Sequence, residues 1–146
     1  MADQNGSQKQ AAIGILVVAH GDLAQVLVET AQRLSGELSK RNITWASVDL
    51  DSSGERNALE TMANDIAKVD EGAGVLVLAD LFGGSAANLA LAQLGDRVEV
   101  VTGANLAMVI DALCRNESSL EALAKRVAKC ATDSVIVAKG LLESAA

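Results

Sequence analysis

Two apolar runs without alternating polar residues constrain the fold of this chain most. "AIGILVVA" covers residues 12–19, and "GVLVLAD" covers residues 74–80. A strand with one solvated face alternates apolar and polar side chains, whereas a strand buried on both faces reads as a continuous apolar run. Such strands occur in parallel sheets that carry helices on both faces. We therefore predict an α/β fold with three layers (α/β/α), flavodoxin-like, with a mainly parallel sheet.

The segments between the apolar runs have the spacing of amphipathic helices. Leu23, Leu27 and Ala31, for example, recur four residues apart, which places them on one helix face. The predicted strands cover 12–19, 43–50, 74–80, 97–103 and 134–139. The predicted helices cover 22–40, 58–69, 86–94, 106–113 and 120–131. Ser85 and Asn105 directly precede two of them, where an oxygen-bearing side chain caps a helix.

Length and charge narrow the class of protein. A chain of 146 residues fits one domain, and we predict that it covers residues 12–146 after a flexible, polar tail at 1–11. The net charge of −7 argues against binding to nucleic acid or to an anionic membrane. No apolar run approaches the roughly 20 residues of a membrane helix, so we expect a cytoplasmic protein. Cys114 and Cys130 are expected to be buried free thiols without a disulfide.

The polar residues that follow the predicted strands indicate the functional site. In parallel sheets, function lies at the carboxyl ends of the strands, where the strand order reverses. His20, the only histidine, follows the first strand, and Asp80 ends the third. The order 2-1-3-4 would make these two strands neighbours and place His20 beside Asp80. A carboxylate that accepts a hydrogen bond from one ring nitrogen fixes the tautomer and leaves the other nitrogen as a nucleophile.

The "GGS" segment at 83–85 supplies groups that bind an anion. The backbone N–H groups of Gly83 and Gly84, the Ser85 hydroxyl and the following helix N-terminus are all suited to a phosphoryl group. Together with His20 and Asp80 they predict a phosphohistidine site. Without these partners, His20 would more often be structural and the glycines only turn residues. There is no Walker A sequence and no pair of Mg²⁺ ligands, so we expect no nucleotide and no metal cofactor.

Other polar residues at the same edge are weaker candidates. Asp49 and Asp51 follow the second strand, and we interpret them as solvated turn residues. Thr102, at the end of the fourth strand, is a weaker candidate than Ser85 and is interpreted as a strand-end residue, whereas Gly103 and Asn105 are expected to shape the loop that walls the site.

Three motifs carry a resemblance to a known family. "ILVVAHGDLA", "LADLFGGSAAN" and "VTGANLAMV" resemble the mannose-type enzyme IIA (EIIA) of the bacterial phosphoenolpyruvate:sugar phosphotransferase system, over about 13–139. Alanine stands at Ala86 and Ala107 where the family usually has proline, and at Ala87 where it has an aromatic residue. These departures affect the partner surface more than the chemistry.

The resemblance implies a specific function. His20 would accept a phosphoryl group from the phosphocarrier protein HPr and pass it to an enzyme IIB component, with Asp80 orienting the ring and Ser85 contacting the phosphoryl group. No IIB sequence follows, so IIB would be a separate chain, and the protein would meet the membrane only through the sugar permease. The family is typically a homodimer that exchanges a C-terminal strand, which "SVIVAK" at 134–139 would provide.

Three other classes of protein share parts of this pattern. Receiver domains share the architecture, and Asp80, Thr102 and Lys139 imitate their site, but "AHG" lacks the acidic pair that holds Mg²⁺ there. The phosphotransfer subunit of dihydroxyacetone kinases is a closer rival, although "LFGGS" favours the mannose type. A regulatory module on the same fold, which senses phosphorylation without serving a transporter, also remains open.

Overall fold

The computed structural model describes residues 11–48 and 55–145. Its strands are β1 (Gly14–Ala19), β2 (Ile43–Ser47), β3 (Val75–Ala79) and β4 (Val98–Thr102). Its helices are α1 (Leu23–Ser35), the short 3₁₀ turn η1 (Gly36–Leu38), α2 (Glu55–Val69), α3 (Ser85–Leu91), α4 (Leu106–Cys114), α5 (Leu120–Asp133) and α6 (Ala138–Ser144).

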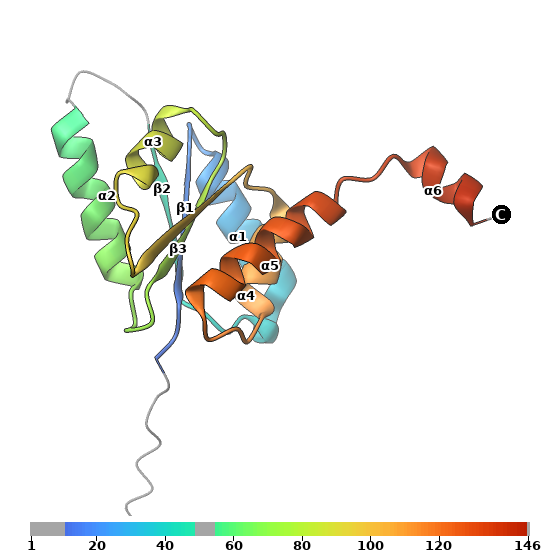
Figure 1. Cartoon of the computed structure of the whole chain (residues 1–146), viewed down its shortest axis with the longest axis horizontal. Coiled ribbons are helices and arrows are strands. Elements are labelled where there is room, and N and C mark those ends of the chain that lie inside the picture. Colours follow the sequence, from blue (N-terminus) through green and yellow to red (C-terminus); the bar gives the residue numbers. More distant parts are fainter. Residues whose placement is uncertain (1–10, 49–54, 146) are drawn as a thin grey trace, which may run out of the picture.

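Among the described residues the strands form one parallel sheet in the order β2-β1-β3-β4. This confirms the predicted fold class and the predicted strand order. Helices α2 and α3 cover one face, and α1, α4 and α5 cover the other (Figure 1). Every residue of β1 and of β3 is buried, which is why their sequences show no alternation. The central pair of strands therefore lies between two apolar layers.

The register of the central strands positions the loops of the site. Val18 of β1 pairs with Ala79 of β3, and the N–H of Asp80 donates to the carbonyl of Val18 at 3.2 Å. His20 and Asp80 therefore leave the sheet side by side, each just beyond the end of its strand.

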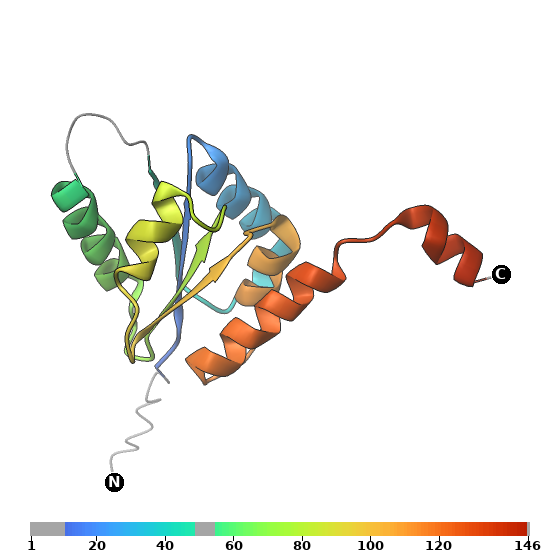
Figure 2. The same ribbon diagram turned by 45° about the horizontal axis from the view of Figure 1, so that its top comes forward.

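The C-terminal segment differs from the prediction. Residues 135–137 are irregular, and α6 begins at Ala138, so the predicted strand at 134–139 is wrong for the single chain. The segment extends away from the sheet in both views (Figures 1 and 2), and it pairs with none of the four described strands. Val135 and Val137 are each 80% exposed. Exchange of this segment concerns two chains and stays a prediction.

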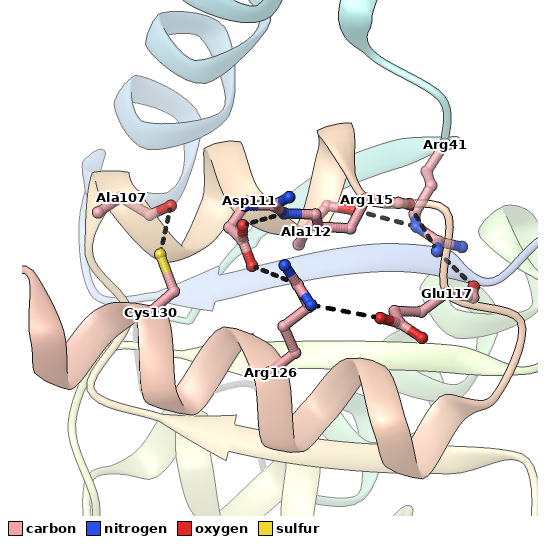
Figure 3. A network of polar contacts seen from close by, with 8 residues as sticks. All are labelled: Arg41, Ala107, Asp111, Ala112, Arg115, Glu117, Arg126 and Cys130. Carbon is pink, nitrogen blue, oxygen red and sulfur yellow. Dashed lines mark hydrogen bonds and ion pairs between the residues drawn. The ribbon is translucent and has the colours of Figure 1, made fainter.

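Arg41, in the loop before β2, connects this loop to the C-terminal end of α4 and the loop after it. Its guanidinium donates to the carbonyls of Ala112 (3.0 Å), Arg115 (2.9 Å) and Glu117 (2.6 Å), as Figure 3 illustrates for part of the network. Ala112 lies in the last turn of α4, where a carbonyl lacks a partner within the helix, and Arg41 satisfies it. Arg115 and Glu117 belong to the loop that follows the helix. Burial lowers the pKa of Arg41, and the Glu117 carboxylate opposes that shift.

Replacing Arg41 with Met is expected to lower the free energy of unfolding by about 2–4 kcal/mol, because partly buried carbonyls lose their donors. Arg41→Lys should recover only part of this loss, because an ammonium group cannot form the planar fork. Urea unfolding followed by circular dichroism measures both variants. An unchanged midpoint for Arg41→Met would contradict the connecting role of Arg41.

A second group of polar contacts joins α4 to α5. Asp111 binds Arg115 at 2.7 Å and lies 3.8 Å from Arg126, which in turn lies 3.5 Å from Glu117 (Figure 3). The thiol of Cys130 lies 3.8 Å from the carbonyl of Ala107, and burial raises its pKa. Both cysteines are free thiols, as predicted, although they are half-buried and not fully buried.

Candidate functional site

The predicted site residues meet at the carboxyl ends of β1 and β3. His20 follows β1, Asp80 follows β3, and Ser85 is the first residue of α3. The Asp80 carboxylate accepts two hydrogen bonds from His20 through the same oxygen. Its Oδ2 lies 2.7 Å from the ring Nδ1 and 3.0 Å from the backbone N of His20. The other oxygen, Oδ1, accepts the N–H of Leu81 at 2.8 Å.

The environments of the two side chains differ in a useful way. The Asp80 side chain is 10% exposed, whereas that of His20 is 47% exposed. Burial alone would raise the pKa of Asp80, but the hydrogen bonds from His20 and Leu81 outweigh it, so the pKa is lowered. Asp80 is thus a fixed anion beneath an accessible imidazole, and it favours the tautomer with the proton on Nδ1.

The second ring nitrogen is held by Ser85. The distance from Nε2 of His20 to Oγ of Ser85 is 2.9 Å. With the proton on Nδ1, Nε2 is an acceptor, and the serine hydroxyl donates to it. The lone pair of Nε2 therefore points toward the Ser85 hydroxyl. When that hydroxyl turns away, the same lone pair is free to attack another group. The arrangement is a nucleophile, an orienting carboxylate and an adjacent donor.

The turn at 81–84 positions these groups. Gly83 has a φ of +80°, a conformation that suits glycine. The N–H of Gly84 donates to the carbonyl of Leu81 at 3.1 Å and closes the turn. This N–H is therefore already used within the protein. The predicted binding of an anion at 83–85 thus depends on the N–H of Gly83, the Ser85 hydroxyl and the N-terminus of α3.

Gly84 has a steric role that the sequence did not predict. A Cβ at this position would lie 3.1 Å from Cε1 of His20 and 3.2 Å from the carbonyl oxygen of Leu81. Both contacts are tighter than ordinary van der Waals distances. The absence of a Cβ at Gly84 therefore leaves room for the imidazole ring of His20.

Gly84→Ala is expected to slow phosphoryl acceptance by roughly tenfold, because a displaced ring loses alignment with Asp80 and Ser85. The turn has ordinary backbone angles at Gly84 (φ −76°, ψ 165°), so the fold should persist. The rate of phosphorylation and the unfolding midpoint, measured on the same preparation, separate these effects. A wild-type rate would contradict the steric role.

Comparison with known proteins decides the family. The profile described as "PTS system fructose IIA component" (EIIA-man) matches residues 14–128, which include the whole site. The chain belongs to the mannose-type EIIA family. This membership confirms the resemblance carried by the three motifs and supports a phosphocarrier role.

Individual relatives agree with this assignment. The "PTS system mannose-specific EIIAB component" of Escherichia coli (strain K12) is 34% identical over 103 residues, covering 69% of this chain and 31% of that protein. The chain therefore spans about a third of the length of the curated relatives it matches.

Solved structures of relatives match over most of their length. The "Mannose/sorbose specific IIA subunit" from Enterococcus faecalis has a TM-score of 0.72 at 26% identity, covering 86% of this chain and 93% of that one. The "PTS IIA protein associated with the fucose utilization operon" from Streptococcus pneumoniae has a TM-score of 0.75 at 26% identity, covering 90% and 98%.

Two predicted helix caps have different outcomes in this EIIA protein. Asn105 caps α4, since its side chain accepts the N–H of Met108 at 2.9 Å. Ser85 does not cap α3. The N-cap residue is Gly84, and Ser85 is the first helical residue. The prediction was wrong because the Ser85 hydroxyl is directed to His20 instead.

The weaker candidates are placed as follows. Thr102 ends β4, the strand beside β3, and is followed by Gly103. Asp49 and Asp51 lie outside the described residues. Lys139, the third member of the receiver-like set, lies on α6, which projects away from the sheet (Figure 1).

Within ranges 11–48 and 55–145, no three His, Cys, Asp or Glu residues are grouped so that they could hold a metal ion. In the same ranges, no helix is both long and apolar enough to cross a bilayer.

Ser47 also contributes to the site, although the sequence did not predict it. Its hydroxyl, at the end of β2, donates to the carbonyl of Gly21 at 2.7 Å. The loop that carries His20 is thus held from both sides, by Asp80 beyond β3 and by Ser47 on β2. The only sign of this contact in the sequence is that a hydroxyl residue ends the strand that pairs with β1.

Proposed function

We propose that this EIIA protein accepts a phosphoryl group from phospho-HPr on Nε2 of His20 and passes it to a separate enzyme IIB component for sugar uptake. The observation that carries the proposal is the position of the His20 ring between Asp80 and Ser85. A ring fixed at Nδ1 and accessible at Nε2 is prepared for in-line attack.

The transfer step needs no cofactor. The Nε2 lone pair attacks phosphorus while the bond to the donor breaks, and the donor's leaving group keeps that electron pair. The ring retains its proton on Nδ1, so positive charge develops on the imidazole, and the Asp80 carboxylate stabilises it. The Ser85 hydroxyl leaves Nε2 and donates to a phosphoryl oxygen. The backbone N–H of Gly83 and the first-turn N–H groups of α3 are the donors proposed for that group, because the N–H of Gly84 already donates to the carbonyl of Leu81.

We also propose that the protein is a cytoplasmic homodimer in which residues 134–139 pair with a second copy. This assembly is supported by the exposure of Val135, Ile136 and Val137, which carry large apolar surface in the single chain. β-branched residues of this kind suit a strand once an edge is available for pairing.

A phosphorylation relay tests the proposal. The protein is incubated with phosphoenolpyruvate, enzyme I and HPr, and the intact mass is measured before and after addition of IIB. We expect one acid-labile phosphate that requires HPr and then disappears onto IIB. No phosphate, with HPr shown to be charged, would contradict the carrier role. A phosphate that never moves to IIB would favour the regulatory module, and movement only to a dihydroxyacetone kinase would favour that system.

A further inference from the structure

A surface cavity between α4 and α5 carries charged residues that the proposed transfer does not use. Its volume is about 550 Å³, which lies in the range of small-molecule sites. The charged residues that line it are Asp111, Arg115, Arg126, Lys129 and Asp133, and none of them belongs to the His20 site. The cavity thus has three cationic groups against two carboxylates, whereas the whole chain has a net charge of −7.

Asp111 provides a buried acceptor in this cavity. Its side chain is only 8% exposed. Its Oδ1 accepts from Nε of Arg115 at 2.7 Å, but its Oδ2 accepts no hydrogen bond from any residue that the structure describes. Nε of Arg126 lies 3.8 Å from Oδ2, which is too long for a hydrogen bond. A buried carboxylate oxygen without a donor is costly, so Oδ2 indicates a donor from outside the chain.

Arg126 provides unused donors beside that acceptor. Figure 3 shows its guanidinium, which comes from α5, between Asp111 and Glu117. The two ion-pair distances, 3.8 Å to Asp111 and 3.5 Å to Glu117, exceed the roughly 2.7–2.9 Å of a charge-assisted hydrogen bond. The planar fork of Arg126 is therefore available to an incoming oxyanion. Lys129, almost one turn further along α5, lines the same cavity and adds a second cation.

We propose that the cavity between α4 and α5 binds a small phosphate monoester that carries hydroxyl groups. The phosphoryl oxygens accept from Arg126 and Lys129, and a neighbouring hydroxyl donates to Oδ2 of Asp111. The excess of cations favours a dianion over a neutral ligand. Water can supply a donor to Oδ2, but water gives no role to the cations beside it. A phosphorylated sugar or polyol satisfies both, because it holds an anion and a hydroxyl donor a few bonds apart.

Titration of the unphosphorylated, ¹⁵N-labelled protein with glucose 6-phosphate tests the site without any phosphoryl transfer to His20. We expect saturable changes in the amide resonances of residues 107–134. Arg126→Gln should weaken binding by roughly tenfold or more, because the phosphate loses a charge-assisted fork. The Arg126 side chain is 43% exposed, so the fold should persist. Arg33→Gln is the matched control, since Arg33 is exposed on α1 outside the cavity, and its affinity should equal that of the wild type.

Two simpler probes test the class of ligand. At about pH 8 both methyl phosphate and glucose 6-phosphate are dianions, but only the second has hydroxyl groups, whereas glucose has hydroxyl groups and no charge. Methyl phosphate and glucose should each bind roughly tenfold more weakly than glucose 6-phosphate. Equal binding of methyl phosphate would overturn the contact to Asp111, and equal binding of glucose would overturn the role of the cations.

Two results would overturn the site itself. One is the lack of any saturable change at millimolar glucose 6-phosphate. The other is a set of changes confined to residues 80–88 that persists in Arg126→Gln, because the anion would then bind beside His20.

Discussion

Replacing His20 with Ala is expected to abolish the acid-labile phosphate that the wild type acquires from phospho-HPr. The chain contains no other histidine, so no second imidazole can take over. The fold should persist, because the His20 side chain is 47% exposed and packs little. Intact-protein mass after incubation with phosphoenolpyruvate, enzyme I and HPr gives a direct comparison.

The comparison needs a variant that keeps the contact to Asp80. His20→Gln retains a side-chain N–H donor beside that carboxylate and lacks a nucleophilic ring nitrogen. It should also remain unlabelled, with an unfolding midpoint closer to that of the wild type. Labelling of either variant at the wild-type level would place the phosphoryl group on another residue.

Replacing Asp80 with Asn is expected to slow phosphoryl acceptance by a factor on the order of 10²–10⁴. The carboxylate accepts from Leu81 through one oxygen and from the His20 backbone and ring through the other. An amide has only one acceptor oxygen, so its NH₂ group must face one of these donors. When the NH₂ group faces the ring, Nδ1 has to accept a hydrogen bond, so the ring proton is on Nε2. A protonated Nε2 has no free lone pair and cannot attack phosphorus. Single-turnover rates at saturating phospho-HPr measure the loss.

A surface variant provides the control for Asp80→Asn. Asp133→Asn removes an exposed carboxylate at the end of α5 that pairs with Lys129. Its rate should match the wild type. If Asp80→Asn also reacted at the wild-type rate, Asp80 would not orient the ring.

Asp80 should also contribute to the pH dependence of the free energy of unfolding in acid. Its pKa is lowered in the folded state, so its ionisation stabilises the fold above the unfolded pKa of about 3.9. That contribution is lost as the pH falls through the lower folded value. Asp80→Asn has no such group, so its unfolding free energy should depend less steeply on pH below about pH 4.

The sequence predicted the parts of the fold that local pattern determines. The continuous apolar runs identified β1 and β3 as the buried central strands, and the strand order then placed His20 beside Asp80. Periodicity identified α1 to α5, with errors of a few residues at their ends, and missed α6. These successes share one cause, since burial on both faces leaves a direct mark on the sequence.

The errors arose where a residue's partner is distant in the sequence. "SVIVAK" has high β-propensity, but residues 135–137 project away from the sheet in the single chain and do not pair with an edge strand. Ser85 has the features of a helix cap, but its hydroxyl binds His20, which is 65 residues away. The steric role of Gly84 and the bond from Ser47 to Gly21 depend on the packing of loops from different strands. No spacing rule predicts such contacts.

The identity of the phosphorylated nitrogen tests the proposed transfer to His20 most directly. Nuclear magnetic resonance of the ¹⁵N-labelled phosphoprotein at alkaline pH, where phosphohistidine is stable, distinguishes the two ring positions. We expect phosphorus to be bonded to Nε2 of His20, with Nδ1 still protonated toward Asp80. Phosphorus on Nδ1 would require the bond to Asp80 to break and would contradict the proposed geometry of the transfer.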